Sequence, residues 1–225
     1  MNVVYHERSM NATVRREQHR QELRRVVLDA AREIFAHEGY ESFSMRKLAK
    51  NIEYSPGSIY LHFKNKEELF ETLVEESFER LQEALNRIKN GDAEEDPTEA
   101  LKKGMRAYVE FGLRNPNDYR FAFLLRPPVL KRPYRVHPAF GAMRYMVGRC
   151  VNERRFRPVD IETASQALWA AIHGITSLLI QRPTFPWAGK KQVIEQVINN
   201  AVDSLTAAPG EMTEAGAHYA DSNRT

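Results

Sequence analysis

Apolar residues recur at spacings of three and four along most of the chain, the period of an amphipathic helix. Between about His19 and Glu38, Leu23, Val27 and Ile34 lie on one stripe that would face a core, and Gly39 follows the last turn. Alternating apolar and polar runs rich in β-branched residues do not occur. The pattern therefore predicts an all-α protein.

Two short helices and one long helix are predicted next. Ser44 is placed to cap the first short helix, and Pro56-Gly57 opens the second. The long helix is expected from about Lys66 to Lys89, with an apolar stripe on one side and glutamates on the other. These elements form a compact N-terminal group of three helices followed by a connecting helix.

A second helical unit is expected after a polar stretch near Asn90–Pro97. Prolines fall in the gaps between its predicted helices, where a missing N–H costs least. Those helices are expected near Pro97–Arg114, Asn117–Leu125, Pro138–Arg155, Asp160–Ile180 and Gly189–Ala207. The organisation predicted from this pattern, with about nine helices, is a basic arm at 1–18, a three-helix unit at 19–66, a connecting helix and linker at 67–96, a helical bundle at 97–207 and a flexible tail at 208–225.

Composition narrows the class of protein. With 42% hydrophobic and 28% charged residues, the chain has the make-up of a folded globular protein. Its single cysteine, Cys150, excludes an internal disulfide and a four-cysteine zinc site. Charged residues interrupt the first 25 positions, so no apolar stretch suited to a signal peptide occurs there. The longest apolar run, Ala167–Ile180, is too short for a membrane span. We expect a cytoplasmic protein without a membrane partner.

The net charge of +3 conceals opposed segments. Residues 1–66 carry 12 Lys and Arg against 8 Asp and Glu, whereas residues 67–100 carry 3 against 12. Residues 101–157 are strongly basic, with 14 against 3, and the remainder has 4 against 7. A basic segment fits nucleic acid, an anionic ligand or a solvated face equally well, so motifs have to decide.

The three N-terminal helices have the spacing of a helix-turn-helix unit. Leu48, Ile59 and Phe63 would brace a short helix from inside, leaving small and hydrogen-bonding side chains outward. Arg46 and Lys47 flank that helix with positive charge, and the arginines of the preceding arm, Arg15, Arg16, Arg20, Arg24 and Arg25, could add contacts to a DNA backbone or minor groove.

The segment GYESFSMRKLAKNIEYSPGSIYLHFKNKEELF, Gly39–Phe70, resembles the DNA-binding region of TetR-type transcriptional regulators. The resemblance implies a capping, phosphate-touching hydroxyl at Ser44, backbone contacts from Tyr60 and His62, and a phosphate contact from Lys66. It also implies that Ser55, Pro56, Gly57 and Ser58 face the bases. The expected DNA-binding set, with the flanking cations, is Ser44, Arg46, Lys47, Ser55, Pro56, Gly57, Ser58, Tyr60, His62 and Lys66.

The chain departs from the family pattern at Asn51-Ile52-Glu53-Tyr54, where glycine is more usual at the third of these positions. Glu53 therefore occupies a turn position suited to positive φ, which is costly for a residue with a side chain. A carboxylate there could also repel phosphate.

In the second unit, Trp169-Ala170-Ala171-Ile172-His173-Gly174 resembles the Trp-x-x-x-His-Gly signature of one TetR-type effector-domain subgroup, and residues 108–123 resemble its early helices. His173 fits either the wall of an effector cavity or a buried histidine bonded to a backbone carbonyl; a lone histidine makes no metal site. Several aromatic residues could line a pocket for a small-molecule effector, with the others in the core. The candidate ligand-binding residues are Tyr108, Phe111, Tyr119, Phe123, Tyr145, Trp169 and His173.

The last two predicted helices carry more apolar surface than one small domain needs. Two such helices from each of two subunits would form a four-helix contact, and a two-fold dimer suits a pseudo-palindromic operator. The candidate dimer residues are Leu168, Ile172, Ile175, Leu179, Val193, Val197, Ala201 and Leu205.

The leading hypothesis is a homodimeric, effector-responsive transcriptional regulator, most simply a repressor, with an activator of the same family as the alternative. A helical small-molecule-binding enzyme is the competing class, but the common nucleophile, zinc-protease and phosphate-loop motifs do not occur in the sequence. A peripheral membrane protein using the basic segment is a third hypothesis. No cofactor or metal is expected.

Overall fold

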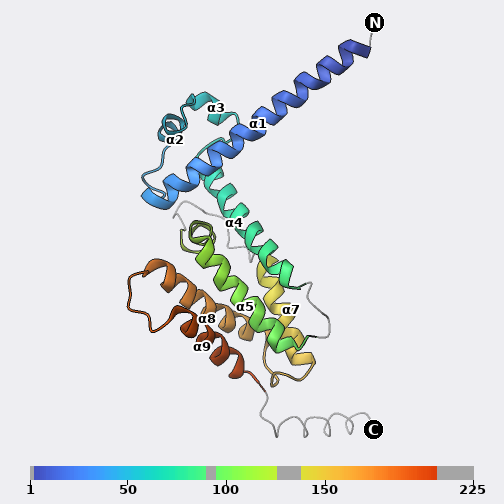
Figure 1. The fold of residues 1–225 in the computed structure, drawn as a ribbon, viewed down its shortest axis with the longest axis vertical. Coiled ribbons are helices and arrows are strands. Elements are labelled where there is room, and N and C mark those ends of the chain that lie inside the picture. The colour runs from blue at the N-terminus through green and yellow to red at the C-terminus, as the bar shows by residue number, and fades with distance from the viewer. Residues whose placement is uncertain (1–2, 90–94, 126–137, 207–225) are drawn as a thin grey trace. The chain divides into compact units, whose positions relative to one another are not determined.

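The computed structural model describes residues 3–89, 95–125 and 138–206 (Figure 1). Every named element in these ranges is helical, and the one β-type pairing there is an isolated bridge between Phe156 and Thr206. The all-α prediction is therefore confirmed. The helices are α1 (Val3–Glu38), α2 (Met45–Asn51), α3 (Pro56–Tyr60), α4 (Lys66–Lys89), α5 (Pro97–Arg114), α6 (Pro116–Tyr119), the π-helix η1 (Arg120–Leu124), α7 (Pro138–Asn152), α8 (Ile161–Gln181) and α9 (Lys190–Asp203).

Contacts divide the chain into two compact units. Unit 1 contains residues 1–77 and 120–132, and unit 2 contains residues 78–119 and 133–225. The division falls inside α4 rather than at the expected boundary after residue 66, and a short segment following Tyr119 belongs to the first unit. The expected tail at 208–225 and most of the polar stretch after residue 89 lie outside the described residues.

The first helix begins at Val3, not near His19, so the segment expected to be an arm is helical from residue 3 onward. No glycine or proline interrupts residues 3–38, and Glu17 pairs with Arg20 at 3.8 Å and accepts a hydrogen bond from Gln21 at 3.3 Å. The apolar stripe begins only at Leu23. The hydrophobic pattern therefore located the packed part of α1 and missed its polar extension.

Unit 1 has an aromatic core. The rings of Phe35 and Phe43 stack with centroids 4.0 Å apart, and Phe70 meets Phe35 edge-on at 5.2 Å. Phe121, from the segment that follows Tyr119, packs on Phe70 at 5.6 Å. Arg32, at the edge of this core, pairs with Glu76 at 2.9 Å. These contacts tie α1 to α4 and provide the base on which α2 and α3 rest.

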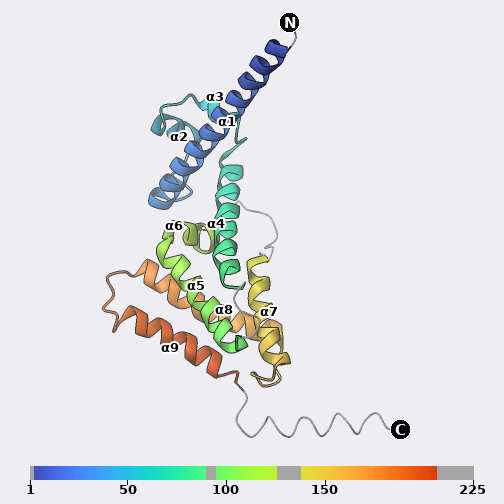
Figure 2. The ribbon, with the colours of Figure 1, turned by 45° about the vertical axis from the view of Figure 1, so that its right-hand side comes forward.

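Unit 2 is a bundle in which α8 packs against α5, α7 and α9 (Figure 2). Gly112 lies where α5 approaches α8: a Cβ atom there would be 2.5 Å from Thr176 Cγ2. The absence of a side chain at this position lets the two helices come close together.

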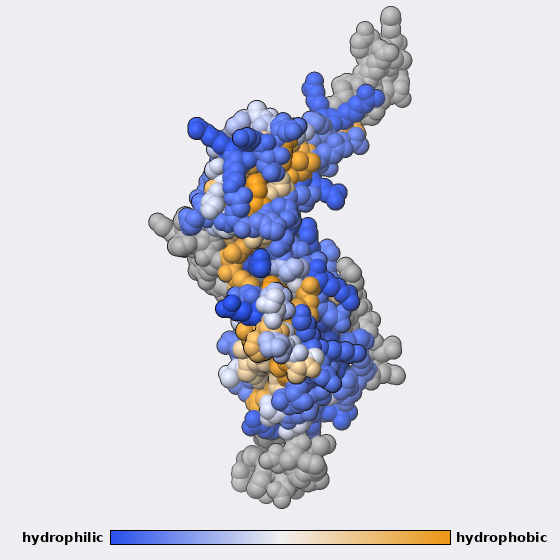
Figure 3. All heavy atoms as spheres, turned by 60° about the vertical axis from the view of Figure 1, so that its left-hand side comes forward, coloured by the Kyte–Doolittle hydropathy of each residue, from blue (hydrophilic) through white to orange (hydrophobic). Residues whose placement is uncertain are grey.

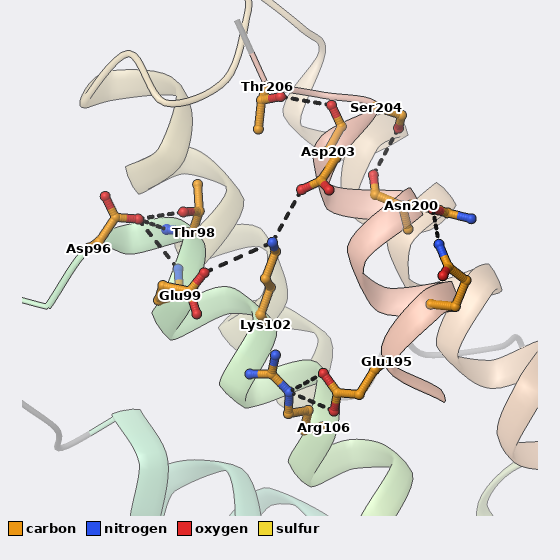
Figure 4. A network of polar contacts seen from close by, with 12 residues as sticks. Asp96, Thr98, Glu99, Lys102, Arg106, Glu195, Asn200, Asp203, Ser204 and Thr206 are labelled. Atoms are coloured by element: carbon orange, nitrogen blue, oxygen red, sulfur yellow. Dashed lines mark hydrogen bonds and ion pairs between the residues drawn. The ribbon is translucent and has the colours of Figure 1, made fainter. Parts of the chain in front are cut away.

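Ion pairs join α5 to α9 (Figure 4). Lys102 reaches Asp203 at 3.2 Å, and Arg106 Nε lies 2.9 and 3.0 Å from the two carboxylate oxygens of Glu195. The hydrogen bond from Arg106 lowers the pKa of Glu195 below its usual range. These pairs fix the register of α9 on α5.

The helix expected at Asn117–Leu125 is instead a short α-helix followed by a π-helical turn. The amide of Leu125 donates to the carbonyl of Arg120 at 2.7 Å, the i to i+5 spacing of a π-helix. The change of helix type falls where the chain passes from unit 2 to unit 1. Periodicity alone could not separate the two kinds of turn.

Candidate functional site

In unit 1, α3 is a short helix braced from behind and open in front. Leu48, Ile59 and Phe63 are buried, as predicted, with Leu48 and Ile59 fully inaccessible. On the outer side, Tyr60 is 51% exposed and Leu61 80% exposed. The sequence pattern Ser55-Pro56-Gly57-Ser58 thus stands at the exposed start of a rigidly supported helix.

Serine side chains begin both short helices. Ser44 Oγ accepts a hydrogen bond from the Lys47 amide at 3.2 Å, and Ser55 Oγ accepts one from the Ser58 amide at 3.1 Å. Ser55 and Ser58 also share a hydroxyl contact at 2.9 Å. Both serines satisfy amides that a helix start leaves open, which confirms the predicted cap at Ser44.

The turn between α2 and α3 has the predicted unusual backbone. Glu53 has φ +60°, in the left-handed region, and its amide donates to the Lys50 carbonyl at 3.4 Å. The chain therefore retains the turn geometry without the glycine that usually permits it, at a conformational cost of about 1 kcal/mol.

Several cations lie on α2 and α4, the helices that precede and follow α3. Arg46 is exposed on α2, and Lys47 beside it pairs with Glu38. Lys66 Nζ lies 4.1 Å from the centroid of the Tyr40 ring and donates to the Tyr40 carbonyl at 3.2 Å. Lys47 and Lys66 thus have partners within the protein, and phosphate binding would have to compete with those contacts.

His62, two residues beyond the end of α3, lies close to arginines of α1. Burial lowers its pKa, and the positive charges of Arg20 and Arg24 lower it further. The guanidinium carbon of Arg24 stands 4.5 Å from the centre of the Phe63 ring. The sequence predicted that these arginines could contact DNA, but nothing in it locates α1 against the end of α3.

In unit 2, four of the predicted ligand-binding residues form one hydrogen-bonded cluster. The Tyr119 hydroxyl lies 2.7 Å from His173 Nδ1, and the Tyr108 hydroxyl lies 3.2 Å from the same nitrogen and 3.3 Å from the Tyr119 hydroxyl. Trp169 Nε1 donates to the Tyr108 hydroxyl at 3.3 Å. We call Tyr108, Tyr119, Trp169 and His173 the aromatic cluster.

Burial shapes the chemistry of the aromatic cluster. Tyr119 is inaccessible to solvent, and burial raises the pKa of its hydroxyl, while burial lowers the pKa of His173. Both groups are therefore held neutral near pH 7. The Tyr119 hydroxyl also lies 3.2 Å from the His173 carbonyl oxygen. The cluster is a set of uncharged donors and acceptors around the buried hydroxyl of Tyr119.

The other three predicted ligand-binding residues lie elsewhere. Phe111 is buried on α5, Tyr145 is 54% exposed on α7, and Phe123 belongs to the segment assigned to unit 1. Phe140, which the sequence did not single out, meets the Trp169 ring edge-on at 6.2 Å. An isolated phenylalanine in an apolar stretch carries no sequence signal of that role.

The predicted dimer residues divide by helix. Leu168, Ile172, Ile175 and Leu179 on α8 are buried within the single chain, so they are not available to a second copy. Val193, Val197 and Ala201 on α9, and Leu205 just beyond it, are half-exposed. The period of α8 could not tell an internal core from a subunit contact, because both need apolar residues. The open apolar positions of α8 are instead Ala167, Ala170 and Leu178, the last 49% exposed.

Within residues 14–86, 95–125 and 140–206, no three His, Cys, Asp or Glu side chains gather in a metal-binding arrangement. In the described part of the chain, no helix has the length and apolarity needed to cross a membrane.

Two family descriptions match different parts of the chain. The family description "Bacterial regulatory proteins, tetR family" matches residues 27–73, and "Tetracyclin repressor-like, C-terminal domain" matches residues 101–205. Together they cover most of the chain, which belongs to the TetR family of transcription regulators.

Several named relatives are transcription regulators rather than enzymes. The chain is 32% identical to the HTH-type transcriptional repressor AcnR of Corynebacterium efficiens over 53% of its own length and 65% of the relative's. It is 35% identical to the HTH-type transcriptional regulator UidR of Escherichia coli over 43% of its own length and 55% of the relative's. The chain thus spans less than two thirds of the length of these relatives. A solved tetR-family regulatory protein from Rhodococcus RHA1 shares the fold, with TM-score 0.65, 20% identity and coverage of 82% of this chain and 97% of that one.

Proposed function

We propose that the chain is a homodimeric repressor that binds a pseudo-palindromic operator through α2 and α3 and is released by a small-molecule effector bound at the aromatic cluster. The observation that carries the proposal is the braced α3, whose outer face presents Ser55, Gly57 and Tyr60. A helix supported in this way can enter the major groove without losing its orientation. The name of AcnR as a repressor favours the repressing sign.

The DNA-contacting residues divide into two roles. We assign Tyr60 and Lys66 to phosphate contacts, which set affinity for any sequence, and Ser58, at the start of α3, to base edges. Tyr60→Phe and Lys66→Gln should therefore weaken binding to operator and random DNA alike, by about tenfold each, while Ser58→Ala changes the preferred sequence.

The test begins with selection of bound duplexes from a random pool, in which a palindromic site is the expected result. Affinities for that site and for random DNA are then measured by fluorescence anisotropy for each variant. Tyr145→Phe and Lys190→Gln, which change exposed residues of unit 2, are the matched controls and should bind like the parent protein. Equal losses in the controls, or no selected sequence, would reject the proposed DNA role.

The proposed dimer uses the open sides of α8 and α9. On the face of unit 2 that carries these helices, apolar and weakly apolar atoms gather in Figure 3. The half-exposed Val193 and Val197 and the exposed Leu178 supply apolar area that a second copy would cover. Sedimentation equilibrium should find a dimer for the parent protein and a monomer for Leu178→Glu. Leu113→Glu, at an exposed leucine of α5, is the control and should remain dimeric.

The proposed effector is an uncharged molecule with an apolar body and a carbonyl or hydroxyl group. Such a group could exchange hydrogen bonds with Tyr108, Tyr119 and His173, whose buried neutral forms disfavour a charged ligand. A compound library screened by thermal shift should return neutral ligands that raise the melting temperature of the parent protein but not of Tyr108→Phe. Expression of a reporter from the selected operator should rise when such a ligand is added. A fall would instead indicate an activator.

A further inference from the structure

The N-terminal half of α1 continues beyond the packed part of unit 1 with a different surface. Each helical residue turns the side-chain direction by about 100°, so the stripe through Leu23, Val27 and Ala31 runs back toward the N-terminus through Arg16 and Arg20. The first set is buried and the second exposed. One face of α1 therefore changes from apolar to basic where the helix leaves the core.

This basic face adjoins the proposed DNA-reading surface. Arg24 stacks over the Phe63 ring at 4.5 Å, and Arg20 and Arg24 act electrostatically on His62 at the end of α3. Both contacts lie within unit 1, so the relation of the arginines to α3 does not depend on the second unit. The row Arg16, Arg20 and Arg24 places positive charge along α1 next to the end of α3.

We propose that Arg16, Arg20 and Arg24 form a third DNA contact, binding phosphates beside the groove that α3 enters. The proposal rests on the proposed DNA-binding function. From Arg16 to Arg24 the helix rises about 12 Å, enough to follow about three successive phosphates of one strand at roughly 3.4 Å of duplex axis each. Glu17 on the same side pairs with Arg20 at 3.8 Å and weakens the positive field of the row.

The remaining arginines of this part of α1 provide an internal control. Arg15 and Arg25 point away from the row by helical geometry, and Arg25 pairs with Asp29 at 3.9 Å. Arg15→Gln/Arg25→Gln removes the same charge from the same exposed helix as Arg16→Gln/Arg20→Gln. Arg24 is left intact in both because it packs on Phe63.

The experiment measures affinity for a random-sequence duplex from 50 to 200 mM salt, using the full chain and both double variants. Each lost phosphate contact should reduce the slope of log K against log salt by about 0.9. For each subunit bound to DNA, Arg16→Gln/Arg20→Gln, the row variant, should therefore reduce the slope by about 1.8. Arg15→Gln/Arg25→Gln, the control variant, should change the slope little. Glu17→Gln should act in the opposite direction and bind more tightly, a result that a merely structural role for the row does not produce. Circular dichroism of each variant checks that α1 remains helical.

The possible results separate the two proposals. A reduced slope in the row variant alone supports the third contact. Equal reductions in the two double variants, or none in either, overturn it while leaving the reading role of α3 intact. If the parent protein binds no DNA at all, both proposals fall.

Discussion

Replacement of Gly112 by alanine probes the close approach of α5 and α8. A Cβ atom at this position would be 2.5 Å from Thr176 Cγ2 and 2.7 Å from Tyr119 Cδ2. Real carbon atoms do not approach so closely, so either the helices must separate or Tyr119 must move. Both Thr176 and Tyr119 are fully buried and have little room to yield.

The change in the free energy of unfolding on replacing glycine by alanine depends on two opposing effects. Overpacking a filled interior costs roughly 1–3 kcal/mol, and alanine gains about 1 kcal/mol over glycine inside a helix. Gly104 lies in the same helix with nothing within 4 Å of its would-be Cβ, so Gly104→Ala receives the gain without the overlap. The free energy of unfolding should therefore be roughly 1–3 kcal/mol lower for Gly112→Ala than for Gly104→Ala.

Urea unfolding followed by circular dichroism measures this difference, with equal protein concentrations in both samples because a dimer's stability depends on concentration. Gly104→Ala should unfold at higher urea than the parent protein, and Gly112→Ala at lower urea. Equal midpoints for the two variants would refute the inferred overlap. Affinity for a cluster-binding ligand should also fall in Gly112→Ala alone, because Tyr119 is displaced.

Three further predictions concern single residues. Glu53→Gly should raise the free energy of unfolding by about 0.5–1 kcal/mol in urea titration, because it relieves the positive φ; a lower midpoint would contradict this. The pKa of His173 is lowered in the folded protein, so its contribution to stability is fully present above about pH 6.5 and declines as the pH falls below that value. In thermal melts at several pH values, His173→Gln should lose this part of the pH dependence of the melting temperature. Burial raises the pKa of Cys150 to about 12, so Ellman's reagent should react at pH 8 only after unfolding, and rapid labelling of the native protein would show that the thiol is accessible.

Structural features were predicted most reliably from the sequence where residues close together in the chain determine them. The limits of α4, Lys66–Lys89, follow from an uninterrupted amphipathic pattern and agree with the structure. The positive φ of Glu53 was expected from the family resemblance, whereas the cap at Ser44 follows from what a helix start requires. Such features depend on neighbours in the chain and can be predicted from them.

Features that depend on distant parts of the chain were harder to predict. The Trp169-to-His173 spacing indicated a shared helix face, and Tyr108 and Tyr119 were candidates as aromatic residues. The hydrogen bonds that join these four residues depend on how distant helices pack, including α5 on α8. Leu168, a candidate for a subunit contact, is buried inside its own chain for the same reason: an apolar stripe does not specify what covers it.

The position of Phe121 has a consequence for dividing this protein into modules. Tyr119 is buried in unit 2 and Phe121 in unit 1, with one residue, Arg120, between them. A truncated protein that ends within α4 would lack Phe121, which packs on the rings of Phe35 and Phe70, and the aromatic core of unit 1 would then be open to water. A chimaera that exchanges effector domains by joining chains at α4 alone would have the same defect. The shortest version of unit 1 with a complete core must therefore combine two separate stretches of the chain, one ending within α4 and one containing Phe121.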